Sequence, residues 1–194
     1  LGYSFCGVDP SQKMLDLAQR RSKTVSWFLA SAEHLPFPEN HFGGATGVLT
    51  VHHWSDLKQA FSELNRVLQP GSNLVLFASS PVQMRGYWLN HYFPEMMQKS
   101  MVQMPSTQSV IQAATDAGFI HSATEIYHVH DDLQDGFLYV GKSRPELYFD
   151  ASIRNGISSF ADLSHADEVK LGLEQLRADI DSGTFLKVQK NYVH

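Results

Sequence analysis

An aspartate and two histidines follow apolar runs in the first third of the chain. Asp9 closes the run 3–9, and His52 and His53 follow the run 45–51. A carboxylate at the end of a strand can accept two hydrogen bonds from the vicinal hydroxyls of a ribose. A second interpretation of Asp9 stays open, because an acid just before a helix is favoured by the helix dipole. An imidazole, whose pKa is about 6.5, can take a proton from a hydroxyl or an amine.

The elements that must position these residues alternate between strands and helices. The runs 3–9, 25–29 and 73–78 read as strands, and so does 45–51, whose lack of polar alternation predicts burial on both faces. Ser11 and Ser55 are the expected N-caps of the two helices, and Pro70-Gly71 is expected to stop the second. That second helix has one apolar face, formed by Leu57, Ala60, Phe61, Leu64, Val67 and Leu68. The alternation predicts βαβ units and a parallel sheet, which binds ligands beyond the carboxyl ends of its strands.

The second half of the chain does not continue the alternation of strands and helices. The segment 83–104 is crowded with aromatic and methionine side chains, and 106–117 reads as a helix that Gly118 ends. The runs 123–129 and 137–141, separated by an acidic turn, predict a β-hairpin. We predict one domain over residues 1–194, with an inserted cap at 82–105 and a helical extension at 145–194.

The composition of the chain excludes several classes of protein. The 194 residues carry a formal net charge of −5 and one cysteine, Cys6, which excludes an internal disulfide and a cysteine-rich metal site. No basic cluster indicates nucleic-acid binding, and no apolar stretch has the length of a membrane span. Among the ten histidines only His128 and His130 have suggestive spacing, and no metal site is expected. A cytoplasmic protein with a small-molecule or protein partner is the expectation.

Four segments in order resemble a known family. They are Asp9-Pro10-Ser11 with Met14, Leu15 and Ala18; residues 30–37, reading ASAEHLPF; His52-His53-Trp54; and residues 63–71, reading ELNRVLQPG. They are similar to the motifs of class I S-adenosylmethionine-dependent methyltransferases, in the small-molecule branch (methyltransferase type 11) related to the ubiquinone and menaquinone enzymes. The resemblance implies a Rossmann-like, doubly wound, mostly parallel sheet with a C-terminal antiparallel strand.

The resemblance also implies a set of residues that bind the cofactor, S-adenosylmethionine. By position, Asp9 holds the ribose hydroxyls and Pro10 lies against the adenine. Ser31 and Ala32 read the edge of the adenine, although the family usually has Asp where Ser31 stands. The backbone that meets the methionine part of the cofactor corresponds to Gly47, Val48 and Leu49. An acid usual in the family is replaced by Gly43.

One motif of the family has no counterpart. Its members open with a central strand and a glycine-rich loop around the methionine part of the cofactor, and no Gly-x-Gly occurs in this chain. The strand would lie between the strand that ends at Asp9 and the strand that ends near Val48. We therefore expect a domain truncated at its N-terminus, and weak or no binding of S-adenosylmethionine by these 194 residues alone.

Three further predictions concern the catalytic histidines, the substrate contacts and the C-terminal extension. His52 and His53 correspond to positions near the transferred methyl group and are the candidate catalytic bases; alternatively, they pack under the cap or orient backbone. Tyr87, Trp88 and Tyr92 are candidate substrate contacts within the inserted cap, where family members carry substrate-covering segments; alternatively, they form a second hydrophobic core. The extension 145–194 is expected to close over the sheet or to make a contact in a homodimer.

The predicted function is methyl transfer from S-adenosylmethionine to an oxygen, nitrogen or carbon atom of a small metabolite. The attack is in line, and the protein supplies orientation and a dry site. The alternative is a non-catalytic Rossmann-like module for binding or dimerisation, which the absence of the glycine-rich loop favours.

Overall fold

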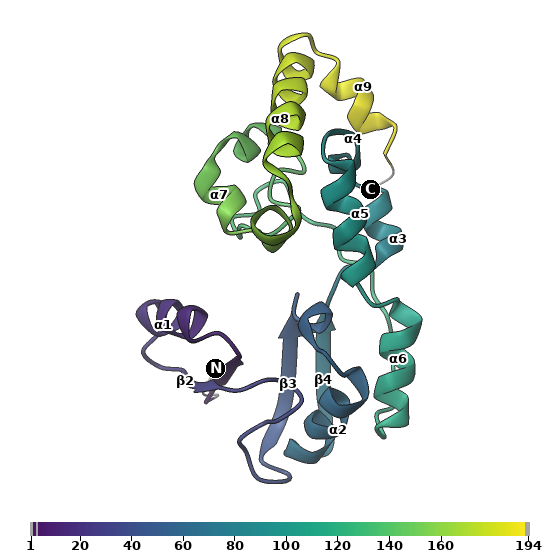
Figure 1. Cartoon of the computed structure of the whole chain (residues 1–194). Coiled ribbons are helices and arrows are strands. Elements are labelled where there is room, and N and C mark those ends of the chain that lie inside the picture. Colours follow the sequence, from purple (N-terminus) through teal and green to yellow (C-terminus); the bar gives the residue numbers. More distant parts are fainter. Residues whose placement is uncertain (1, 3, 193–194) are drawn as a thin grey trace. The chain divides into compact units, whose positions relative to one another are not determined.

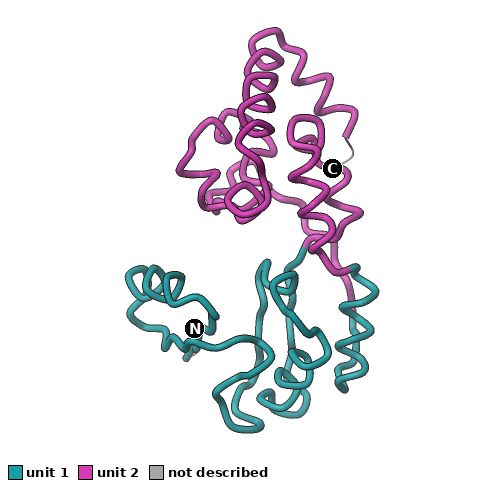
Figure 2. Tube along the Cα trace, in the orientation of Figure 1, with its two compact units in different colours: residues 1–78, 106–122 teal, residues 79–105, 123–194 magenta. Residues whose placement is uncertain are grey.

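The chain forms two compact units, seen in a computed structural model that describes residues 2 and 4–192. The first unit runs to Ala78 and includes Ser106–Ser122, and the second comprises Ser79–Pro105 and the chain from Ala123 onward (Figure 2). The predicted inserted cap and the predicted helical extension therefore belong to the same unit.

The first unit opens with a parallel pair of strands. Strand β1 (Cys6–Asp9) pairs with β2 (Ser26–Leu29) in a register that sets Asp9 opposite Leu29. Helix α1 (Gln12–Arg21) connects them, and the Ser11 side chain caps its N-terminus by accepting from the Met14 amide, as predicted. These elements place Asp9 at the carboxyl edge of the pair.

A second parallel pair follows. Strand β3 (Phe42–Val48) pairs with β4 (Leu68–Phe77), and the short turn η1 (Val51–His53) and helix α2 (Leu57–Val67) connect them (Figure 1). Helix α2 is capped by Asp56, whose carboxylate accepts from the Gln59 amide, and not by Ser55 as predicted. Strand β4 also begins earlier than predicted, since it includes Pro70-Gly71.

The two pairs are separate sheets. Among the described residues no backbone ladder joins β1 to β3, which is the position where the family resemblance places a central strand. Val48 and Val75 are 58% and 61% exposed, so one face of the β3–β4 pair is open. The prediction that the run 45–51 is buried on both faces is therefore wrong in this structure. The other face of the β3–β4 pair packs against α2, whose Ala60 and Phe61 are fully buried.

Helix α6 (Thr107–Asp116) completes the first unit. It packs against α2, with the Asn65 side chain donating to the Ala117 carbonyl at 2.8 Å. Ser106 caps it, and Gly118 follows it with a φ of 99°, as predicted for a glycine that ends a helix.

The second unit is a helical bundle around an aromatic core. Its helices are α3 (Pro81–Arg85), α4 (Leu89–Tyr92), α5 (Pro94–Gln103), η2 (Pro145–Phe149), α7 (Ala151–Asn155), η3 (Ser159–Leu163), α8 (Ala166–Asp181) and α9 (Phe185–Lys190). Trp88 is fully buried and meets Phe185 and Tyr148 edge-on, at centroid distances of 5.0 and 5.6 Å. Helix α8 approaches α4 so closely at Gly172 that a Cβ there would lie 2.3 Å from the Tyr92 carbonyl.

The predicted hairpin does not form. Residues 123–129 lie in no helix or strand, and 137–141 form turns whose Leu138 and Val140 side chains are buried in the core of the second unit. The C-terminal antiparallel strand is thus absent from the described part of the chain. Ile126 is 75% exposed, because β-forming residues become a strand only when a neighbouring strand pairs with them.

None of the helices in the described ranges combines the length and the apolar character needed to cross a membrane.

Candidate functional site

The carboxyl edge of the β1–β2 pair brings together the residues predicted to bind the adenosine part of the cofactor. The Ala30 amide donates to the Asp9 carbonyl at 3.3 Å, so the loop 30–37 starts beside Asp9. The Ser11 amide donates to Oδ1 of Asp9 at 2.8 Å, which orients this half-buried carboxylate. Ser31 and Ala32 are half-buried in the same loop. Pro10 is exposed next to Asp9.

The loop 30–37 is fixed by Glu33, which is only 7% exposed. Its Oε1 accepts from the Ser55 amide at 2.6 Å, from the Ser55 hydroxyl at 3.0 Å and from the Asp56 amide at 3.3 Å. Burial alone raises the pKa of this carboxyl, but hydrogen bonds from its own backbone amide, from Ser31, from Ser55 and from Asp56 outweigh it. They lower the pKa of Glu33 from 4.5 to about 2. Glu33 is therefore ionised at neutral pH.

A second attachment holds the other end of the same loop. Glu63 accepts from the Leu35 amide at 2.9 Å, and Arg66 donates to the Phe37 carbonyl at 2.7 Å and to the Leu35 carbonyl at 3.0 Å. Glu63 and Arg66 form an ion pair one turn apart on α2, with nitrogen and oxygen 2.7 Å apart. The hydrogen bond from Arg66 lowers the pKa of Glu63. This explains why the segment 63–71 accompanies the segment 30–37 as a motif.

The end of β3 carries the three residues predicted to meet the methionine part of the cofactor. Leu49 has a φ of 50°, in the left-handed region that a leucine rarely adopts, and its amide donates to the Phe77 carbonyl at 2.7 Å. A Cβ on Gly47 would lie 2.9 Å from a Leu76 methyl carbon, so the chain is tightly packed there. Val48, between them, is exposed.

His52 and His53 lie on the turn η1, at the carboxyl edge of the β3–β4 pair. Their rings are 4.0 Å apart between centroids, and His52 is half-buried while His53 is exposed. Burial, and then the nearby His53, lower the pKa of His52 from 6.5 to about 4. His52 is therefore neutral at pH 7, and it is a weak base because its conjugate acid is strong.

The predicted substrate contacts belong to the second unit. Tyr87, Trp88 and Tyr92 are at most 3% exposed in the core of the second unit. Their polar atoms have partners: the Tyr148 hydroxyl at 2.7 Å for Tyr87, the Lys142 carbonyl for Trp88 and the Asp179 carboxylate for Tyr92. This position favours the alternative interpretation, a second hydrophobic core, because no surface of these three rings is free to touch a ligand.

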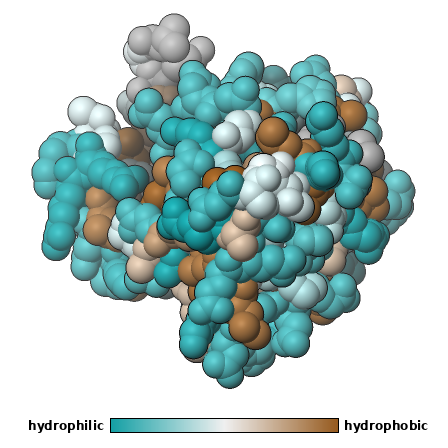
Figure 3. Space-filling model, turned by 90° about the horizontal axis from the view of Figure 1, so that it is seen from above, coloured by the Kyte–Doolittle hydropathy of each residue, from teal (hydrophilic) through white to brown (hydrophobic). Residues whose placement is uncertain are grey.

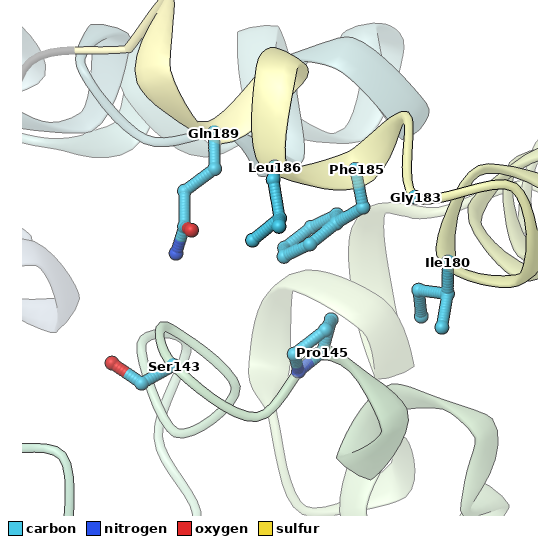
Figure 4. A pocket seen from close by; sticks show the side chains of 7 residues that line it. All are labelled: Ser143, Pro145, Ile180, Gly183, Phe185, Leu186 and Gln189. Atoms are coloured by element: carbon cyan, nitrogen blue, oxygen red, sulfur yellow. The ribbon is translucent and has the colours of Figure 1, made fainter.

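A cavity of about 390 Å³ lies in the second unit, and none of the predicted site residues lines it. Figure 4 shows Phe185, Leu186 and Gln189 of α9 pointing from one side toward Ser143 and Pro145 on the other. No titratable side chain lines it, so it offers little chemistry. On the face of the molecule shown in Figure 3, apolar side chains lie in small groups between hydrophilic ones. Among the described residues, no three His, Cys, Asp or Glu side chains are grouped to hold a metal ion.

The residues present fit the adenosine part of S-adenosylmethionine. A carboxylate for the ribose and a buttressed loop for the adenine lie at one sheet edge, with Asp9 and Ala30 in backbone contact. When bound, the cofactor supplies an electrophilic methyl group on a positively charged sulfur. The segment 47–49, predicted to border the methionine part, has a left-handed backbone at Leu49.

Sequence reasoning assigned no role to Glu33, Glu63 or Arg66, although each lay in a recognised motif. Their contacts span 22 to 31 residues of sequence, which no periodicity reveals. The available signal was the presence of these charged residues within the segments 30–37 and 63–71 that carry the resemblance.

The first part of the chain is similar to known methyltransferases. A family model described as a methyltransferase domain matches residues 1–76. The chain is 35% identical over 88 residues to the uncharacterized protein YafE of Escherichia coli (strain K12), covering 42% of each chain. It is 31% identical over 114 residues to the ubiquinone/menaquinone biosynthesis C-methyltransferase UbiE of Shewanella sp. (strain ANA-3), covering 49% of this chain and 45% of that protein. The chain thus spans less than half the length of these curated relatives.

A solved structure matches nearly the whole chain. It is a putative methyltransferase from an antibiotic biosynthesis pathway of Anabaena variabilis, with 31% identity and a TM-score of 0.82, and the match covers 96% of this chain and 74% of that one. The Rossmann-like α/β fold class is confirmed by this match. The cofactor of the matched methyltransferase family is S-adenosylmethionine. The chain belongs to the family of S-adenosylmethionine-dependent methyltransferases.

Proposed function

We propose that the protein transfers the methyl group of S-adenosylmethionine to an oxygen, nitrogen or carbon atom of a small metabolite. The observation that carries the proposal is the contact between the Asp9 carbonyl and the Ala30 amide, which sets a carboxylate beside the loop of Ser31 and Ala32. A ribose diol and an adenine edge need these two groups side by side.

The roles follow from position and chemistry. Asp9 accepts from the ribose hydroxyls, Ser31 and Ala32 contact the adenine, and the backbone of 47–49 borders the methionine part. The positive sulfur activates the methyl group, so the protein's main task is to orient the nucleophile. His52, with a pKa of about 4, is a poor proton acceptor at pH 7. Of the two candidate bases, the exposed His53 is the one we assign to accepting a proton.

The relatives suggest where to look for the substrate. Those named demethylmenaquinone methyltransferase and ubiquinone/menaquinone C-methyltransferase act on precursors of quinones, as their names state. We infer that a small ring compound of this kind is the first substrate class to test.

The alternative function is a non-catalytic module for binding or dimerisation. It is favoured by the lack of a Gly-x-Gly loop and by the two separate strand pairs, since an open strand edge can pair with another chain.

One experiment separates the two functions. The protein is purified and examined by mass spectrometry for bound cofactor, and it is then incubated with isotopically labelled S-adenosylmethionine and a panel of hydroquinones, phenols and amines. Labelled product that disappears in Asp9→Ala supports the enzyme. No bound cofactor and no product, together with a concentration-dependent dimer in solution, would establish the alternative.

A further inference from the structure

The Glu33 carboxylate stands between two loops that the proposed function uses. On one side it belongs to the predicted adenine loop itself, directly after Ser31 and Ala32 in the sequence. On the other, its Oε1 receives the Ser55 amide at 2.6 Å and the Asp56 amide at 3.3 Å, at the N-terminus of α2. One buried acid therefore ties both loops together.

Both functional positions are only a few residues from this acid. Ala32 is its neighbour in sequence, and His53 lies two residues before Ser55. The main-chain carbonyl of Glu33 adds a further bond, accepting from the Gln59 side chain of α2 at 3.3 Å. A displacement at Ser31 or Ala32 reaches Glu33 along the chain within two residues. From Ser55, which Glu33 binds, the turn of His52 and His53 is at most three residues away.

We propose that Glu33 is a positioning residue that couples the adenine loop to the turn carrying His52 and His53. The inference rests on the proposed function, because it gives that function a link between the cofactor and the proton-accepting side of the site. Adenine that settles on Ser31 and Ala32 fixes the Glu33 side chain, and Glu33 in turn holds the amides of Ser55 and Asp56.

The chain contains a matched control for this role. Glu63 is also a carboxylate that holds the loop 30–37 to α2, through the Leu35 amide at 2.9 Å. It acts near the far end of the loop and α2, without contact to Ser55 or Asp56. A general loosening of the loop would follow from losing either acid, whereas coupling to the histidine turn is specific to Glu33.

The first test needs no cofactor. Amide hydrogen exchange of Ser55 and Asp56 is measured by NMR in the 194-residue chain, with Ala32→Gly introduced into the wild-type, Glu33→Gln and Glu63→Gln backgrounds. The glycine loosens the backbone directly before Glu33, so we expect Ala32→Gly to accelerate exchange by about fivefold in the wild-type and Glu63→Gln backgrounds, and to have no effect in Glu33→Gln. An equal acceleration in all three backgrounds would overturn the proposal. Should Glu33→Gln fail to fold, Glu33→Asp replaces it, since the shorter side chain keeps the charge but cannot reach both loops.

The second test adds adenosine, which has no methionine part and no methyl group. It can therefore reach His52 and His53 only through the protein. We expect adenosine to shift the amide signals of Ser31 and Ala32 and the imidazole signals of both histidines, and to shift only the former in Glu33→Gln. Histidine shifts that persist in Glu33→Gln contradict the coupling and leave the proposed function intact. No shift anywhere means that these 194 residues do not bind adenosine, and the exchange measurement then decides the coupling by itself.

Discussion

Replacing Glu33 by Gln should destabilise the first unit strongly at neutral pH and weakly in acid. The pKa of this carboxyl is 4.5 in the unfolded chain and about 2 in the folded unit. Each unit of pKa difference corresponds to about 1.4 kcal/mol, so the ionised carboxylate stabilises the fold by about 3 kcal/mol at pH 7. Because the folded pKa is the lower one, this stabilisation is complete above pH 4.5 and disappears as the pH falls toward 2. At pH 3 about 1 kcal/mol remains.

The assay must report on the first unit alone, since the chain has two compact units and a single unfolding transition cannot be assumed. Urea-dependent hydrogen exchange of the amides in β3 and β4 provides this readout at pH 7 and at pH 3. The control is Glu174→Gln, an exposed carboxylate on α8 of the second unit. A Glu33→Gln cost of less than about 1 kcal/mol at pH 7, or an equal cost at both pH values, would contradict this role of the carboxylate.

Three further predictions concern single residues. His52 should titrate near pH 4, so the first unit should lose stability as the pH falls from 6.5 toward 4; an imidazole NMR titration showing a midpoint near 6.5 would contradict this. Leu49→Gly should stabilise the first unit by about 1 kcal/mol, because glycine adopts a φ of 50° without strain. Urea-dependent hydrogen exchange of the β3 amides measures this, and an unchanged free energy of unfolding would refute it. Gly172→Ala should destabilise the second unit by about 1–3 kcal/mol, because the new Cβ would lie 2.3 Å from the Tyr92 carbonyl. Exchange in α8 measures that loss, and Leu171→Ala, at a 64% exposed neighbouring position, should cost under about 0.5 kcal/mol.

Much of the first unit followed from the sequence, because its signals are local. The alternation of apolar runs with helix caps predicted β1, α1, β2, β3, α2 and β4, and parallel pairing then placed Asp9 at a carboxyl edge. The break between β1 and β3 falls where the resemblance placed a central strand, and no strand of the described residues lies between them.

The rest depends on partners distant in sequence. The run 123–129 has β-forming residues but no strand beside it, so its pattern predicted a hairpin that does not form. Aromatic residues such as Tyr87 and Trp88 occur both in ligand-binding surfaces and in hydrophobic cores. Only the packing of η2 and α9 against them distinguishes these two interpretations. The role of Glu33 was not predictable, because it depends on hydrogen bonds to an element 22 residues away.

The central claim is that the edge formed by Asp9 and the loop of Ser31 and Ala32 binds the adenosine part of S-adenosylmethionine. Titration of the isotopically labelled chain with S-adenosylmethionine, followed by NMR, tests it directly and detects weak binding as well as strong. We expect the amide signals of Asp9, Ser31 and Ala32 to shift together along one binding curve, and Asp9→Ala to weaken the binding by at least about tenfold. Shifts confined to other residues, or a curve that Asp9→Ala leaves unchanged, would contradict it.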